Sequence, residues 1–150
     1  MLDDLYQAII LDHGRKPRNH RKIEGATHRA EGYNPLCGDR LVLELLVEGG
    51  KIKDVAFEGC GCAISQASAS LLSLEVKGLS AEEATGLSLR LRLALTKDGP
   101  MDGLGELECL LGVRRYANRV KCATLAWHAL DSALGEGGVV STEARAETEQ

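Results

Sequence analysis

Residues 41–57 read LVLELLVEGGKIKDVAF, and this stretch decides the fold. Residues 41–47 are apolar apart from Glu44, a pattern that predicts a strand covered on both faces. Gly49-Gly50 suits the two-residue loop of a β-hairpin, and residues 52–57 supply the returning strand. With an extended stretch at residues 25–33 before it, the sequence predicts a small antiparallel sheet of about three strands.

Helices flank this sheet on both sides in the sequence. Residues 2–13 place apolar side chains at the i, i+3, i+4 spacing of a helix with one buried stripe. Ser80 and Glu83 form a capping-box pattern that opens a helix running to about residue 95. Further helices are predicted at residues 62–76, at 104–111 as a short segment, and at 119–134 with Asn118 as N-cap.

Strands that come mainly before helices indicate the α+β class, here a small antiparallel sheet packed against helices. The apolar pattern ends near residue 134, so residues 1–134 are predicted to form one domain. Residues 135–150 are mostly glycine, charged and small polar residues without apolar periodicity, which predicts a disordered C-terminal tail.

Composition and charge exclude several classes of protein. The net charge of −4 argues against a nucleic-acid partner, which needs a clustered positive surface. No apolar run reaches the roughly 20 residues of a membrane-spanning helix. The odd count of five cysteines, in a chain without an export signal, predicts thiols kept for metal or sulfur chemistry in the cytoplasm.

The first cysteine segment is Cys37-Gly38-Asp39, in a loop between two extended stretches. A thiolate and a carboxylate are both acceptable zinc ligands, and the glycine between them frees the backbone to aim both at one point. The alternative interpretation is a tight turn in which the aspartate caps local amides and the cysteine is incidental.

The second segment, Cys60-Gly61-Cys62, lies where a strand gives way to a helix. Cys62 is predicted in the first helical turn, where unpaired amides stabilise a thiolate. Two cysteines at this spacing rarely bind one tetrahedral metal together, and the spacing is not that of thioredoxin-like redox pairs. Packing of small residues under a tight turn is the alternative.

The third segment contains Cys122, predicted in the first turn of the last helix, where a lone cysteine could equally be core. Cys109 has no acid, glycine or histidine arranged about it and is interpreted as core. Spacing therefore offers Cys37, Asp39, Cys62 and Cys122 as a metal site. Sulfur-rich ligand sets suit zinc or an iron–sulfur cluster, and spacing does not choose between them.

Four separated motifs resemble those of the U-type iron–sulfur cluster assembly proteins, the IscU/SufU family. The resemblance covers about residues 3 to 134, and it implies an α+β fold of the SufE/IscU type. The motifs are Asp12-His13 with Pro17-Arg18-Asn19, Asn34-Pro35-x-Cys37-Gly38-Asp39, Gly59-x-Gly61-Cys62-Ala63-Ile64-Ser65, and Arg119-x-Lys121-Cys122-Ala123-x-Leu125-x-Trp127.

The SufU branch is the more similar of the two. Lys121 stands where the IscU branch has a histidine, and the long segment before it contains the insertion at residues 104–111. Cys62 matches the SufU position of the second cysteine, whereas Cys60 falls where the IscU branch has its cysteine. Cys62 is therefore the favoured ligand, and Cys60 is the alternative.

The resemblance to SufU implies a zinc-bound sulfur acceptor that receives persulfide sulfur from a PLP-dependent cysteine desulfurase. Cys37 would be the acceptor thiol, with Cys37, Asp39, Cys62 and Cys122 as zinc ligands. The resemblance to IscU implies instead a scaffold, binding iron or a labile 2Fe–2S cluster that is passed to apo-acceptors. A structural zinc domain is a third hypothesis. The chain is thus at most a zinc-dependent sulfurtransferase, and otherwise a non-enzymatic scaffold.

Overall fold

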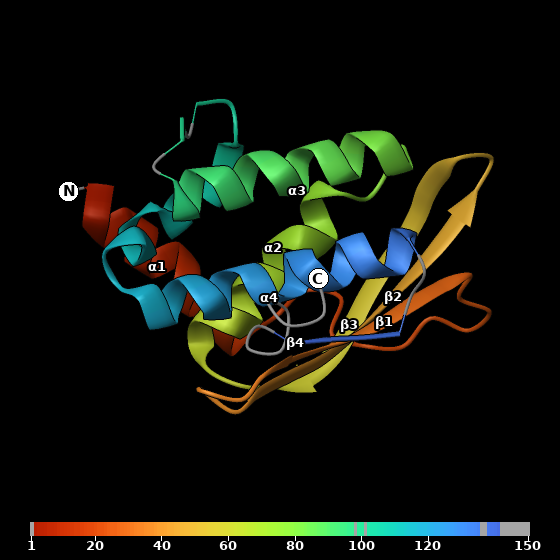
Figure 1. Ribbon diagram of the computed structural model, residues 1–150, viewed down its shortest axis with the longest axis horizontal. Coiled ribbons are helices and arrows are strands. Elements are labelled where there is room, and N and C mark those ends of the chain that lie inside the picture. The colour runs from red at the N-terminus through yellow and green to blue at the C-terminus, as the bar shows by residue number, and fades with distance from the viewer. Residues whose placement is uncertain (1, 98, 101, 136–137, 142–150) are drawn as a thin grey trace, which may run out of the picture.

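The computed structural model describes residues 2–97, 99–100, 102–135 and 138–141 (Figure 1). It confirms the predicted α+β class, with an antiparallel three-stranded core sheet packed against helices. The elements in chain order are α1 (Leu2–Arg15), β1 (His28–Asn34), β2 (Asp39–Glu48), β3 (Lys51–Cys60), α2 (Ala63–Glu75), α3 (Ala81–Thr96), the 3-10 helix η1 (Gly105–Arg115), α4 (Ala117–Leu134) and β4 (Gly138–Ser141).

The sheet has the strand order β3-β2-β1-β4. β2 and β3 form the predicted hairpin, and Gly49 and Gly50, both with positive φ, make its loop. β4 lies within the stretch predicted as a disordered tail, and it pairs with β1 in parallel. Gly135, the first residue of that stretch, is the C-cap of α4. Residues 136–137 and 142–150 lie outside the described residues.

The helices cover one face of the sheet (Figure 1). α4 packs on β1 and β2, α2 packs on β3, and α3 packs on α4. Burial in β2 therefore alternates: Leu41, Leu43 and Leu45 are buried, whereas the residues between them are only partly covered. The prediction of a strand covered on both faces was wrong, because none of the described helices packs on the second face.

The last helix begins earlier than predicted. α4 starts at Ala117, and its N-cap is Tyr116, which makes no side-chain capping hydrogen bond. Asn118 is therefore a residue of the first turn and not the N-cap, and Cys122 lies in the second turn. The capping box of Ser80 and Glu83 at the start of α3 is confirmed, with both reciprocal hydrogen bonds present.

The segment after α1 is fixed to α2 and β3 by hydrogen bonds. The backbone N–H of Arg18 donates to Ser70 Oγ at 2.8 Å, and the side-chain amide of Asn19 donates to Ser73 Oγ at 3.0 Å. The Asn19 carbonyl accepts from the N–H of Phe57 in β3. The N-terminal motif therefore positions α1 and its following loop, and none of its residues is among the donors that cluster at the cysteine site.

His13 is a buried structural histidine with a consequence for pH dependence. It is only 4% exposed, and its Nδ1 lies 2.7 Å from Ser70 Oγ. Burial, and then the charge of Arg18, lowers its pKa below the ordinary value of 6.5. The unfolded chain therefore takes up a proton at mildly acidic pH that the folded chain resists.

The contribution of neutral His13 to the free energy of unfolding is expected to be complete above about pH 6.5. As the pH drops below that value, this contribution is lost and the free energy of unfolding falls. His13→Gln should be less stable at pH about 7.5 but lose less stability on acidification to about 5.5. Urea unfolding of the metal-free protein at both pH values measures this. Equal losses in the variant and the wild type would contradict the assignment.

Candidate metal centre

The mouth of the β1–β2 hairpin presents the first two predicted ligands. Asn34 and Asp39 pair at its base, and residues 35–38 form the loop between them. Gly38 has a φ of +72°, a conformation that a side chain would oppose. Cys37 is exposed at this loop, whereas Asp39 points to the helix-covered side and is fully buried.

The start of α2 supplies the third predicted ligand, Cys62. Cys62 is the N-cap, and its sulfur accepts a hydrogen bond from the N–H of Ser65 at 3.5 Å. The backbone N–H of Cys62 donates to Asp39 Oδ1 at 2.8 Å. The strand-to-helix turn and the hairpin mouth are thus tied together through the carboxylate.

Gly61 makes this contact sterically feasible. A Cβ at residue 61 would collide with the carboxylate oxygen of Asp39, and φ is +158° there. Gly61→Ala is therefore expected to displace Asp39 and weaken metal binding at least tenfold, since orientation of ligands carries such factors. Zinc competition with a chromophoric chelator measures the change. Gly50→Ala, which meets no atom within 4 Å, controls for the cost of a glycine with positive φ. Unchanged zinc affinity in Gly61→Ala would contradict the steric argument.

Cys122 completes the set from α4. Its side chain is fully buried, and its sulfur lies 3.3 Å from the sulfur of Cys37. Donor atoms of Cys37, Asp39 and Cys122 all lie within 4.8 Å of one another. The thiols of Cys122 and Cys62 are in hydrogen-bond contact. The structure therefore brings the mouth of the β1–β2 hairpin and the start of α2 together with α4.

The two contacting thiols share protons unequally. The pKa of Cys62 is lowered to about 6, first because the Cys122 thiol donates to its sulfur and further because the Ser65 N–H does so, against the effect of burial. The pKa of Cys122 is raised, first by this hydrogen bond with Cys62 and then by burial. Cys62 is thus the thiolate of the pair, as its position at a helix N-terminus predicts.

The donor set fits a tetrahedral metal. With bonds of about 2.3 Å to sulfur and about 2.0 Å to oxygen, ligand atoms around zinc lie roughly 3.3–3.8 Å apart. The Cys37 and Cys122 sulfurs, 3.3 Å apart, lie at the lower end of this range, and the three donors of Cys37, Asp39 and Cys122 all lie within 4.8 Å of one another. A ligand set of three sulfurs and one carboxylate suits zinc or an iron–sulfur cluster. Within this set, Cys37 is the residue exposed at the surface.

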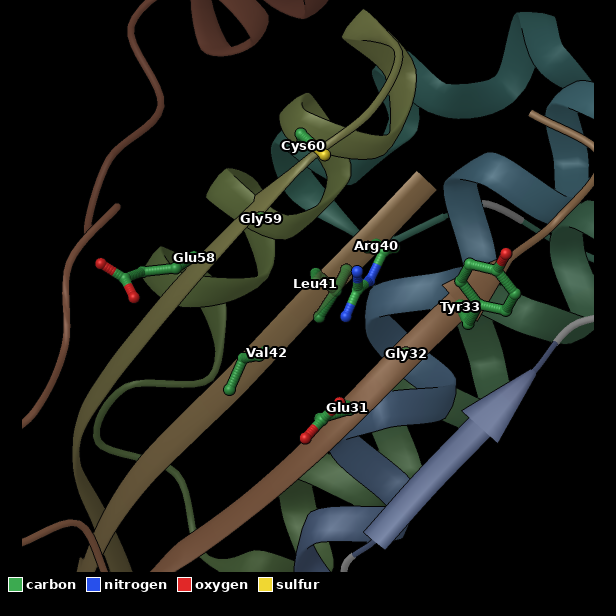
Figure 2. A pocket seen from close by; sticks show the side chains of 9 residues that line it. All are labelled: Glu31, Gly32, Tyr33, Arg40, Leu41, Val42, Glu58, Gly59 and Cys60. Carbon is green, nitrogen blue, oxygen red and sulfur yellow. The ribbon is translucent and has the colours of Figure 1, made fainter. Parts of the chain in front are cut away.

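Cys60 lies on the other face of the sheet. It pairs with Arg40, and Arg40 follows the inward-facing Asp39 by one residue, so both Arg40 and Cys60 face away from the helices. Both line a groove of about 530 Å³ together with Tyr33 and Glu58 (Figure 2). The Cys60 thiol is therefore not among the thiols that meet at the site, which are those of Cys37, Cys62 and Cys122.

Cys109 is buried in η1, and burial raises the pKa of its thiol to about 12. This agrees with its interpretation as core. Asn34 is the site residue that the sequence-based interpretation did not identify. Its side-chain amide contacts both Asp39 Oδ2, at 3.1 Å, and Cys122 Sγ, at 3.5 Å. The sequence feature that could have identified Asn34 is its position directly before the four-residue loop that leads to Asp39.

Comparisons with known proteins identify the family to which the chain belongs. Residues 5–136 match the model of the NifU-like N terminal domain. The chain is 39% identical over 142 residues to the zinc-dependent sulfurtransferase SufU of Bacillus subtilis (strain 168), covering 91% of this chain and 95% of that protein. It is 39% identical over 135 residues to the iron–sulfur cluster assembly scaffold protein IscU of Streptococcus pyogenes serotype M1, covering 89% and 84%.

A solved structure shows the same fold. The crystal structure of FiSufU from Fervidobacterium islandicum AW-1, described as an iron–sulfur cluster assembly scaffold protein for the SUF system, superposes with a TM-score of 0.80 at 38% identity. The alignment covers 84% of this chain and 93% of that one. The chain therefore belongs to the family of NifU-like N-terminal domains, the U-type iron–sulfur cluster assembly proteins that its sequence resembles.

Proposed function

We propose that this protein works in iron–sulfur cluster assembly as a zinc-dependent sulfurtransferase, and that Cys37 accepts persulfide sulfur from a PLP-dependent cysteine desulfurase. The single observation that carries this proposal is the arrangement of the donor set. One thiol, Cys37, is exposed, while the thiol of Cys122 and the carboxylate of Asp39 are fully buried beside it. The relative named zinc-dependent sulfurtransferase SufU spans nearly the whole chain and supports the same function.

Cys37, Asp39, Cys62 and Cys122 would hold the zinc. When bound, zinc keeps coordinated thiols deprotonated at neutral pH and ties the segments together. The thiolate of Cys37 attacks the terminal sulfur of the donor's cysteine persulfide, since the thiolate is the nucleophilic form. A new sulfur–sulfur bond forms at Cys37, the bond in the donor persulfide breaks, and the donor cysteine leaves as a thiolate.

The positions of the three cysteines suit this division of work. Cys62 is held by the Ser65 N–H at the start of α2, and Cys122 is enclosed within α4 and the sheet. Cys37 lies in a loop that contains Gly38, so it can change its conformation more easily than a helical residue. A sulfur donor from solution can reach only an exposed thiol of this set.

Sulfide release by a cysteine desulfurase from the same organism tests the proposal. Turnover with cysteine and a reductant is expected to rise several-fold when the zinc-loaded protein is added. The protein stripped of zinc by a chelator should give no stimulation, and readdition of zinc should restore it. Equal turnover with and without the zinc-loaded protein would contradict the proposal.

A scaffold role is the second candidate, because the relative named IscU scaffold protein is equally similar at 39% identity. Iron or a labile 2Fe–2S cluster would then be the cargo of the same thiols. Anaerobic incubation with iron and sulfide distinguishes the two functions. A stable cluster chromophore that passes to an apo-acceptor protein would favour the scaffold, and loss of iron on desalting would favour the sulfurtransferase.

A further inference from the structure

Asn34 lies at the centre of the cysteine site without offering a metal-binding thiol or carboxylate. It ends β1, opposite Asp39, and its side chain is fully buried. A buried side-chain amide must find hydrogen-bond partners, because leaving one unpaired away from water destabilises the fold. The partners of Asn34 include two of the groups assigned above as metal ligands.

One nitrogen serves both partners. Nδ2 of Asn34 donates to Asp39 Oδ2 at 3.1 Å and to Cys122 Sγ at 3.5 Å. A carboxamide nitrogen carries two hydrogens, so the two bonds can exist together. The other carboxylate oxygen, Oδ1, accepts from the backbone N–H of Cys62 at 2.8 Å. Each oxygen of Asp39 therefore accepts a hydrogen bond from a fixed N–H donor, which sets the orientation of the carboxylate.

We propose that Asn34 is a positioning residue of the metal centre, which fixes the Asp39 carboxylate and donates an N–H to the sulfur of Cys122. This inference rests on the proposed function, because it assigns the same four groups to the metal. Hydrogen bonds from neighbouring residues orient metal ligands and tune their donor strength. Asn34 holds two ligands from different elements, β2 and α4, in one orientation.

The bond to sulfur has a chemical consequence. An N–H donor withdraws electron density from a thiolate, which weakens it as a nucleophile and keeps it as a ligand. Cys122 is thus held twice, by burial and by Asn34, whereas Cys37 lies exposed in its loop. Asn34 thereby helps to direct sulfur transfer to Cys37 and to reserve Cys122 for the metal.

Asn34→Leu tests this, because leucine is close in volume but donates no hydrogen bond. Zinc affinity, measured by competition with a chromophoric chelator, is expected to fall about 10- to 100-fold. In cobalt(II)-substituted protein, the thiolate-to-cobalt charge-transfer band should move to lower energy, since removing the N–H raises the energy of the sulfur lone pair. A change that only destabilised the fold would leave this band in place.

Ser88→Ala is the matched control. Ser88 is also fully buried and hydrogen-bonded, to the Trp127 carbonyl and to Asp131, but it contacts none of the four groups of the site. It should lower the melting temperature while zinc affinity stays within twofold and the cobalt spectrum is unchanged. Zinc affinity within twofold and an unshifted band in Asn34→Leu would overturn the inference.

A measurement on the wild-type protein covers the case in which Asn34→Leu does not fold. After substitution with cadmium-113, a scalar coupling between the metal and an Asn34 side-chain amide proton is expected, because the N–H bonds to a metal-bound sulfur. Absence of this coupling would overturn the inference alone. Failure of the wild type to bind zinc or cadmium would overturn the proposed function and this inference with it.

Discussion

Replacement of Cys37 by alanine is expected to abolish stimulation of the cysteine desulfurase, to less than about 1% of the wild-type effect, because no other exposed thiol lies in the cluster. Cys122 is fully buried and Cys62 is half-buried at the start of α2. Cys122 therefore cannot meet a sulfur donor without movement of α4, and the Cys62 sulfur is already bonded to the Ser65 N–H. The loss should appear in turnover measurements at saturating concentrations of the variant.

Cys37→Asp separates loss of the acceptor from loss of the metal. Aspartate offers an oxygen that can ligate zinc, but it cannot form a persulfide. This variant is expected to retain zinc and to give no stimulation. Cys60→Ala is the control, since Cys60 is an exposed thiol on the opposite face of the sheet, and it should stimulate like the wild type. Stimulation by Cys37→Asp would show that Cys37 is not the acceptor.

The second large effect is expected at Cys62, and Cys60 provides the comparison. Zinc binding to sites of this kind contributes about 10–16 kcal/mol, so removing one of four ligands should cost roughly 3 kcal/mol, or about 100-fold in affinity. Cys62→Ser is expected to show this loss. Cys60→Ser should bind zinc within about twofold of the wild type, because its side chain points away from Asp39.

Chelator competition on both serine variants, prepared in parallel, gives the two affinities. Far-ultraviolet circular dichroism establishes that each variant is folded before its affinity is compared. If Cys60→Ser lost affinity as strongly as Cys62→Ser, the register that places Cys60 opposite Arg40 could not describe the metal-bound protein. The IscU-like position of the second cysteine would then be the ligand.

Local patterns were sufficient for most of the fold. Gly49-Gly50 and the capping box of Ser80 depend on residues close in sequence, and both appear as predicted. The predicted start of α4 was wrong. Asparagine is a residue type that often caps helices, but Asn118 lies inside the first turn and Tyr116 is the N-cap. The burial of β2 on a single face depends on where distant helices pack, and no local pattern in residues 41–47 contains that information.

In the site, too, local motifs were predictable from the sequence, whereas contacts between distant segments were not. Composition and motif placed Cys37, Asp39, Cys62 and Cys122 in one predicted set. In the structure the donor atoms of Cys37, Asp39 and Cys122 lie within 4.8 Å of one another, and the Cys62 thiol contacts that of Cys122. The choice between Cys60 and Cys62 could not be made from spacing, because it depends on which face of β3 each side chain occupies. Asn34 was not identified for a related reason: its bond to Cys122 spans 88 residues of sequence.

Among the described residues, no helix combines the length and the apolar composition needed to cross a lipid bilayer.

Metal content of the protein as purified, determined by inductively coupled plasma mass spectrometry without added metal, distinguishes a zinc-bound sulfurtransferase from a cluster scaffold. We expect close to one zinc per chain, negligible iron and no visible absorption from a cluster. Loss of that zinc in Cys122→Ala and its retention in Cys60→Ala should accompany this result. A chain purified without zinc, or one that carries iron with the absorption of an iron–sulfur cluster, would contradict the account.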